Sequence, residues 1–240
     1  MKVILLEHTP NPEQIIAMAA KLCYSKVGVE ELKDTLDEKS VQSFLQRLVD
    51  LGHESPLEHI GFTFGIEGIS RSCSQQLVRH RMASFSQQSQ RYVNLDKTFD
   101  YITPDCIKDY CEKYYDDLMA KIYDSYVAMS SFLKDKFIEN GIDEKSAEKK
   151  AIENARYILP NACETKLVVT MNARSLLNFF KLRCCNRAQD EIRAVADEML
   201  KLCKEVAPMI FSHAGAPCMH GKCTEGKMSC GNPRKEDDVE

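Results

Sequence analysis

The chain has 240 residues and a mass of 27.3 kDa, enough polypeptide to bury one substantial hydrophobic core or two small ones. A formal net charge of −4 and a pI near 5.9 exclude a global attraction to nucleic acid or anionic membranes, so any anion-binding chemistry has to be local. No apolar run approaches the ~20 residues that a membrane helix needs, and the N-terminal apolar stretch is too short for a signal peptide. We therefore expect a cytoplasmic protein whose eleven cysteines are mostly free thiols.

Hydrophobic periodicity predicts an α+β fold with few strands and many helices. In two segments apolar residues alternate with small or polar ones, which is typical of strands. Elsewhere apolar residues recur every three or four positions between Asn, Pro or Gly punctuation, which is typical of amphipathic helices. In chain order we expect a strand at 3–6, helices at 12–23 and 30–51, a strand at 60–66, a helix at 70–80, irregular chain at 82–92, helices at 105–139 and 143–159, a strand at 165–171, and helices at 173–182 and 188–210.

These elements predict a single domain over residues 1–215, with a central, mostly antiparallel sheet and flanking helices. Residues 216–240 are poor in large apolar side chains and rich in Cys, so we expect a flexible tail. Three thiols and one imidazole of this tail could complete a tetrahedral zinc shell, but their spacing matches no standard zinc finger. Free thiols are the other interpretation, and we assign no metal site. The four side chains are Cys218, His220, Cys223 and Cys230.

The chain lacks both common glycine-rich phosphate-binding motifs, G-x-G-x-x-G and G-x-x-x-x-G-K-[ST]. If it holds phosphates, side-chain cations must do more of the work. Residues 79–81 read Arg-His-Arg, and a Ser- and Gln-rich stretch leads from them to Arg91 and Tyr92. Guanidinium groups match phosphate oxygens bidentately, so this segment predicts an anion site. A solvated basic helix end is one alternative, and a single-stranded nucleic-acid-binding module over Arg79–Tyr92 is another.

A second set of Asn and Arg residues opens the helix expected after residue 172. Arg174 and Asn178 are four residues apart and therefore share a helix face, while Asn172 is placed to cap the helix. This pattern favours a binding site at the helix N-terminus. The alternative is a simple N-cap followed by surface charges, among them Arg183.

Four segments together resemble, in order and spacing, those of the flavin-dependent thymidylate synthases. Arg-His-Arg at 79–81 followed by Ser89 resembles the family signature, and residues 52–59, 155–160 and 172–183 resemble three further family segments. The resemblance implies reductive methylation of dUMP to dTMP, with methylene-tetrahydrofolate as carbon donor and FAD relaying hydride from NADPH. It also implies a homotetramer with active sites shared between subunits, and no nucleic-acid or membrane partner.

The resemblance implies site residues by position. FAD would contact Ser55, Arg79, His80, Arg81, Gln87, Asn172, Ala173, Arg174 and Asn178. The substrate dUMP would contact Gln76, Arg79, Gln87, Gln88, Ser89, Gln90, Arg91, Arg156 and Arg183. In the reaction, Arg183 would stabilise negative charge on the pyrimidine, Ser89 would bond the substrate, and His53 would lie beside the flavin where folate and nicotinamide compete for access.

Cysteines directly follow Arg183, so a thiol nucleophile at Cys184 or Cys185 has to be considered. The resemblance implies a mechanism without a protein thiol nucleophile. The chain also departs from the family pattern: Gln87 stands where members often have an acid, and Arg187 stands where some have a His. A role for a carboxylate at the first position would be lost here.

Overall fold

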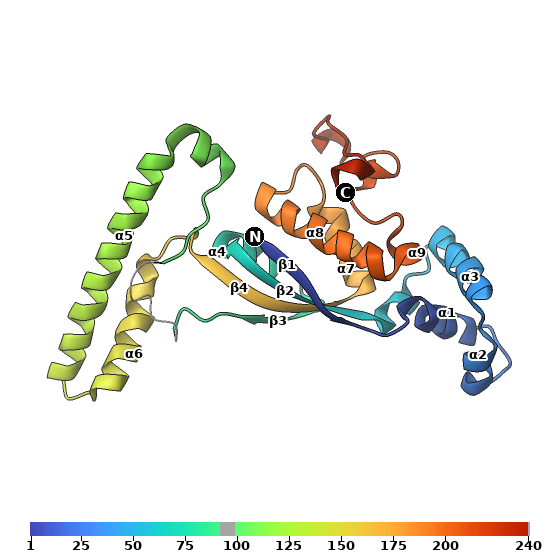
Figure 1. Cartoon of the computed structure of the whole chain (residues 1–240), viewed down its shortest axis with the longest axis horizontal. Helices are drawn as coiled ribbons and strands as arrows, with labels where there is room; N and C mark the ends of the chain where they lie inside the picture. Colours follow the sequence, from blue (N-terminus) through green and yellow to red (C-terminus); the bar gives the residue numbers. More distant parts are fainter. Residues whose placement is uncertain (92–98, 240) are drawn as a thin grey trace. The chain divides into compact units, whose positions relative to one another are not determined.

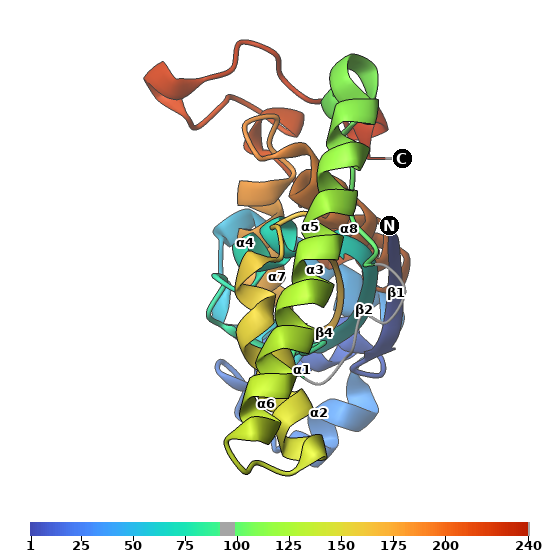
Figure 2. The same ribbon diagram turned by 90° about the vertical axis from the view of Figure 1, so that its left-hand side faces the viewer.

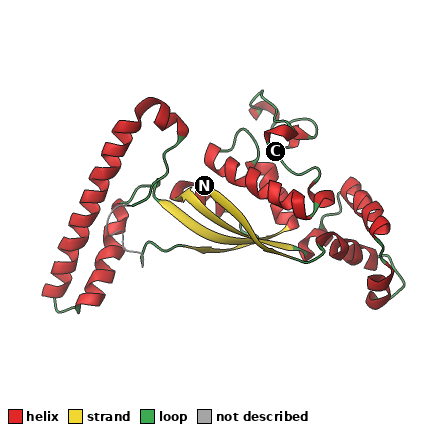
Figure 3. Ribbon diagram, viewed as in Figure 1, coloured by secondary structure: helices red, strands yellow, loops and turns green. Residues whose placement is uncertain are grey.

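The computed structural model describes residues 1–91 and 99–239, with the side chains of residues 49 and 50 left aside (Figure 1). The fold is α+β, as expected, with a four-stranded antiparallel sheet in the order β1-β2-β4-β3 (Figure 3). Its strands are β1 (Lys2–His8), β2 (Gly61–Ser70), β3 (Ala83–Gln87) and β4 (Glu164–Asn172). The helices are α1 (Pro12–Leu22), α2 (Val29–Thr35), α3 (Glu38–Leu51), α4 (Arg71–Leu77), α5 (Asp105–Glu139), α6 (Glu144–Ala155), α7 (Ala173–Arg183), α8 (Asp190–Val206) and α9 (Pro208–Phe211). Short 3-10 helices are η1 (Ser55–His59), η2 (Arg156–Ile158), η3 (Pro217–Met219), η4 (Gly226–Met228) and η5 (Glu236–Asp238).

Residue contacts divide the chain into two compact units. Unit 1 consists of residues 1–67, 76–86 and 167–240, and unit 2 consists of residues 68–75 and 87–166. Most of the sheet belongs to unit 1. Within the described part of the chain, no helix combines the length and the hydropathy that crossing a bilayer needs.

The core of unit 1 lies on one face of the sheet. Phe62, Phe64 and Ile66 on β2 are fully buried on this face, where α8 packs on β1 and α7 packs on α8 (Figure 1). Burying each such side chain contributes about 1.5–3 kcal/mol. Ile4 and Leu6 on β1 point to the opposite face and are exposed. The predicted period-two pattern of the second strand is therefore confirmed, and the sheet has one covered and one open face.

Unit 2 is built on a helical hairpin of α5 and α6, which lie side by side (Figure 2). The span predicted as one helix, 105–139, is helical, but a kink at Cys111, whose φ and ψ are −156° and 30°, divides it into a short first helix and a long second one. It ends at Glu139, and Gly141, whose φ of 84° suits a residue without a side chain, turns the chain toward α6, which Asp143 caps through its carboxylate. Phe99, Met119 and Cys163 form the buried centre of this unit.

The helix predicted over 30–51 is instead two helices. Leu36 adopts an extended conformation between α2 and α3, and the Asp37 carboxylate accepts a hydrogen bond from the Ser40 N–H at 2.7 Å. This bond caps α3, and the Ser40 hydroxyl, followed by the Ser40 N–H, holds the pKa of Asp37 below its usual value. The helical spacing of apolar residues continues across this break, so the sequence pattern did not indicate it. Asn11 stands at the N-cap position of α1, but it adopts a left-handed φ of 47° and its side chain makes no capping hydrogen bond.

Two further predictions differ near residue 80. The segment predicted to be irregular, 82–92, contains the edge strand β3, whose alternating serines give only a weak apolar period. The helix predicted over 70–80 is the shorter α4, because β2 continues to Ser70. The Ser70 hydroxyl accepts a hydrogen bond from the Cys73 N–H at 3.0 Å and so starts the helix.

The last predicted helix, 188–210, is divided into α8 and α9 at Pro208, which has no N–H to donate. Beyond it, where the sequence predicts a flexible tail, the side chain of Arg234 is only 6% exposed. Its guanidinium contacts Asp197 on α8 and the Cys184 carbonyl at the end of α7. Composition alone does not predict this contact, because it depends on one arginine and not on large apolar side chains.

Candidate functional site

A cavity of about 250 Å³ in unit 1 brings together residues from separate sequence motifs. It lies where β4 passes into α7, beside the turn that follows Leu77. The sequence predicts five of its lining residues as cofactor ligands: His80, Arg81, Asn172, Arg174 and Asn178. The remaining walls are Glu58, Met82 and Ser175.

Asn172 forms the junction between β4 and α7. Its Oδ1 accepts a hydrogen bond from the Ser175 N–H at 2.8 Å, which confirms the predicted N-cap. The Ala173 N–H donates to the Ile60 carbonyl at 3.1 Å, so this predicted cofactor donor is already engaged within the protein. Because the cap fixes where the helix begins, it also fixes which residues of the first two turns line the cavity.

Arg174 is held by two carboxylates that the sequence analysis missed. Its Nε donates to Glu54 Oε2 at 3.2 Å, and its Nη1 donates to Glu58 Oε1 at 2.6 Å. Glu58, followed by Glu54, raises the pKa of the Arg174 guanidinium, which is therefore a permanent cation. The four-residue spacing of the two acids beside a short 3-10 helix was the available signal for this clamp.

Arg183 and His80 meet although 103 residues separate them in sequence. Arg183 Nε donates a hydrogen bond to His80 Nε2 at 3.1 Å, so this ring nitrogen is the acceptor and the imidazole is neutral. Burial, followed by the charge of Arg183, lowers the pKa of His80 to about 4. The edge-to-face contact of the His80 ring with Phe179, with centroids 4.9 Å apart, fixes the ring plane.

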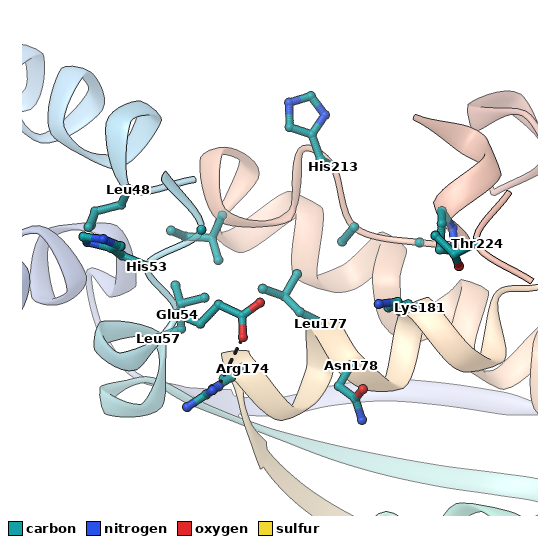
Figure 4. A pocket seen from close by; sticks show the side chains of 15 residues that line it. Leu48, His53, Glu54, Leu57, Arg174, Leu177, Asn178, Lys181, His213 and Thr224 are labelled. Atoms are coloured by element: carbon teal, nitrogen blue, oxygen red, sulfur yellow. Dashed lines mark hydrogen bonds and ion pairs between the residues drawn. The ribbon is translucent and has the colours of Figure 1, made fainter. Parts of the chain in front are cut away.

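A larger cavity of about 700 Å³ in the same unit is lined by the third predicted catalytic residue, His53 (Figure 4). Arg174 and Asn178 line this cavity as well as the smaller one, so one helix face serves both. Lys181, one turn further along α7, adds a cation that sequence reasoning missed. Thr224 of the C-terminal segment contributes to the wall.

Five predicted residues of unit 1 line neither cavity: Ser55, Gln76, Arg79, Ala173 and Arg183. Ser55 is exposed at the start of η1, Arg79 is exposed after α4, and Gln76 is half-buried on α4. Tyr92, where the segment considered for nucleic-acid binding ends, lies outside the described residues.

The other predicted substrate residues belong to unit 2. The Gln87 Nε2 donates to Ser74 Oγ at 2.9 Å and to Thr165 Oγ1 at 3.1 Å, so this amide stabilises the unit from inside. Gln88 and Gln90 are half-buried in the same stretch. The side chain at position 87 is thus a structural donor in this chain.

Glu153 connects two of the predicted substrate arginines. Its carboxylate pairs with Arg91 Nε at 2.7 Å, and its carbonyl accepts from Arg156 Nε at 3.2 Å. The Ser89 Oγ accepts a hydrogen bond from the Arg91 N–H at 3.2 Å, which shapes the turn. Arg71 is a further cation near this stretch, because its Nη1 lies 3.5 Å from the Gln88 carbonyl. Burial lowers the pKa of Arg71, and the nearby Arg156 adds to that.

The Cys-rich segment does not form the zinc shell considered from sequence. Both ring nitrogens of His220 have partners, Nδ1 with Glu236 at 2.9 Å and Nε2 with the Ala214 carbonyl at 3.2 Å. Across residues 1–91 and 99–239, no three His, Cys, Asp or Glu side chains are grouped so that they could hold a metal ion.

Comparison with known proteins agrees with these motifs. A family model described as "Thymidylate synthase complementing protein" matches residues 4–209. A "Flavin-dependent thymidylate synthase" of Clostridium tetani is 55% identical over 96% of this chain and 93% of the relative. Proteins of the same name from Geobacter sulfurreducens and Pyrococcus horikoshii are 49% and 40% identical, over 96% and 95% of this chain and 94% and 91% of the relatives. The chain belongs to the flavin-dependent thymidylate synthase family.

Proposed function

We propose that this enzyme methylates dUMP to dTMP, with methylene-tetrahydrofolate as carbon donor and with FAD relaying hydride from NADPH. Its family membership supports thymidylate synthesis with a flavin. The observation that carries the proposal is the cavity in which His80, Arg81, Asn172, Arg174 and Asn178 converge. These residues come from the two family motifs that the sequence places about 90 positions apart.

The residues of this cavity fit a flavin dinucleotide chemically. Arg81 and Arg174 supply guanidinium donors for a diphosphate, and Asn172 and Asn178 supply amides for the polar edge of a ring system. Glu54 and Glu58 occupy Nε and Nη1 of Arg174, and this orients the remaining Nη2. When bound, the flavin supplies the hydride that completes the methyl group.

Arg183 is the proposed electrophilic residue for the substrate. A guanidinium stays protonated at pH 7, so it does not act as a base, but it stabilises negative charge developing on the uracil ring at N3 and O4. His80 orients Arg183 by accepting its Nε–H. Ser89, Gln87–Arg91 and Arg156 are proposed to hold the rest of the uridylate, and Gln76 and Arg79 remain proposed contacts.

The proposed reaction uses no protein thiol. Cys184 follows Arg183 but is fully buried, and burial followed by Asp197 raises the pKa of its thiol well above the usual range. A protonated, enclosed thiol is a poor nucleophile. Cys185 is half-buried. His53, on the wall of the larger cavity, is proposed to control access of folate and nicotinamide to the flavin.

We also propose assembly as a homotetramer with shared sites. Each unit exposes an apolar face that a second copy could cover. In unit 2, Tyr110 and Tyr114 on α5 are 87% and 73% exposed, and in unit 1 Leu6 on the open face of the sheet is 52% exposed. Such patches are typical of association surfaces.

The proposal is tested on the purified protein by its absorbance spectrum, followed by turnover. We expect a yellow protein, or one that becomes yellow on adding FAD, whose flavin bands shift when dUMP is added. Incubation with dUMP, methylene-tetrahydrofolate and NADPH should yield dTMP by mass spectrometry. A colourless protein that cannot be reconstituted refutes the flavin role. Salt-sensitive binding of single-stranded oligonucleotide without turnover would favour the nucleic-acid module instead.

A further inference from the structure

Among the described residues, Arg234 is the one charged residue that is buried, at 6% exposure. Its Nη1 donates to the Cys184 carbonyl at 2.7 Å and to the two Asp197 oxygens at 2.9 and 3.0 Å, and its Nη2 donates to the Asp238 carbonyl at 2.7 Å. A guanidinium satisfied in this way has one orientation, because its planar fork meets fixed acceptors. It therefore acts as a rigid connector between the C-terminal segment and the helices of unit 1.

The hydrogen bond from Arg234 to the Cys184 carbonyl matters because of where Cys184 lies. Cys184 is the C-cap residue of α7 and directly follows Arg183. A cation that donates to a carbonyl at a helix C-terminus stabilises the last turn, where intrahelical partners run out. Asp197 reaches the Cys184 side chain as well, and this interaction contributes to its raised pKa. The end of α7 is therefore held through both its backbone and its side chain.

The segment that carries Arg234 also borders the larger cavity, through Pro217 and Thr224. A second ion pair, between Arg187 Nη1 and Glu225 Oε2 at 2.6 Å, ties the segment to the chain after α7. Both members of that pair are exposed, so its contribution is expected to be small. The Arg234 contacts and the Arg187–Glu225 ion pair thus differ in burial and in the residues they reach. Of the two, the Arg234 contacts are the ones that bond the end of α7.

We propose that Arg234 is a positioning residue for thymidylate synthesis: by bonding the Cys184 carbonyl and Asp197, it fixes the last turn of α7 and thereby the direction of Arg183. The inference rests on the proposed function, which assigns Arg183 to dUMP. The guanidinium of Arg234 itself does not touch the reacting atoms. Its effect on the reaction passes through Arg183.

The test is a double-mutant cycle in the full-length protein, with turnover and the dUMP dissociation constant by calorimetry as readouts. We expect Arg234→Ala to lower kcat/KM for dUMP by about 10-fold, with flavin content per folded protein unchanged. In an Arg183→Ala background the same change should alter kcat/KM by less than about 2-fold, because the residue through which it acts is gone. The matched control, Arg187→Ala, removes the exposed anchor and should stay within about 2-fold of the parent protein.

Equal losses from Arg234→Ala in both backgrounds would indicate a general structural role and overturn the inference. So would wild-type activity of Arg234→Ala, or an equal loss in Arg187→Ala. If Arg234→Ala does not fold, Arg234→Lys takes its place in the cycle, since it keeps the charge opposite Asp197 but not the planar fork. Wild-type activity of Arg183→Ala would refute the assigned role of Arg183 and this inference with it. If Arg183→Ala lowers kcat/KM and the losses from Arg183→Ala and Arg234→Ala add in the double variant, only the role of Arg234 is overturned.

Discussion

Arg183 donates its Nε–H to Nε2 of His80, across 3.1 Å and 103 residues of sequence. The acceptor is a neutral imidazole, so the bond directs the guanidinium without cancelling its charge. Arg174 on the same helix has two carboxylate partners instead. The helix α7 thus carries two arginines in different electrostatic settings, one neutralised and clamped, the other oriented by a neutral ring. This difference underlies the first three predictions.

Replacing Arg183 with Ala should lower kcat for dTMP formation by about 10²–10³-fold, the cost of removing one preorganised donor to developing charge. Flavin content should stay within about 2-fold of wild type, because the residue is assigned to the substrate. Turnover by mass spectrometry and flavin absorbance after gel filtration measure the two effects separately. A parallel loss of both would reassign Arg183 to cofactor binding or folding.

The stability of the protein should depend on pH through His80. Its pKa in the folded protein, about 4, is below the value of 6.5 in an unfolded chain. Between these values the unfolded state binds more protons than the folded state, so the free energy of unfolding rises with pH. The contribution of His80 to that free energy is present above about pH 6.5 and is lost as the pH falls to about 4. Urea titrations over that range should show a shallower pH dependence for His80→Gln, which keeps an acceptor for Arg183. Identical slopes would mean that His80 titrates normally.

Arg174→Ala should weaken flavin binding by about 10–100-fold, as expected for one charge-assisted hydrogen bond to a phosphate. Glu58→Gln should have a smaller effect in the same direction, because it loosens the clamp and keeps the cation. The matched control is Arg47→Ala, an exposed arginine on α3 that lines neither cavity and bonds Ser43 at 3.3 Å. Titration of the apoprotein with FAD gives the dissociation constants. Equal values for Arg174→Ala and the control would contradict the assignment.

Gln87→Ala should lower the free energy of unfolding by about 1–2 kcal/mol, since two side-chain hydrogen bonds inside unit 2 are lost. Relatives are expected to carry a carboxylate at this position, which could not donate these hydrogen bonds. In this chain the side chain of Gln87 is therefore expected to contribute to stability. Gln75→Ala, at an exposed position of the same unit, is the control and should have little effect. Denaturant unfolding of both variants settles the comparison, and equal midpoints would show that the Gln87 bonds carry no stability.

Local signals in the sequence predicted the elements that position the site. The change from a period of two to a helical period at Asn172, together with its capping chemistry, predicted β4, α7 and the face they present. The break at Leu36 was missed because the apolar period continues through it, and β3 was missed because polar serines alternate along it. Long-range pairing has no local signal at all. The meeting of His80 with Arg183 follows from the packing of the whole unit rather than from any short segment.

The eleven cysteines, all free, divide sharply by exposure. Cys73, Cys163, Cys184 and Cys203 are buried, and burial raises the pKa of Cys163 to about 11. Alkylating reagents should therefore mark the surface thiols quickly and reach the enclosed ones only when the fold opens. The surface set is Cys23, Cys106, Cys111, Cys223 and Cys230. The native cysteines can therefore serve as footprinting probes, because the order in which they are alkylated reports which parts of the fold open first. The exposed thiols can also form disulfide crosslinks between copies when the protein is stored without a reductant.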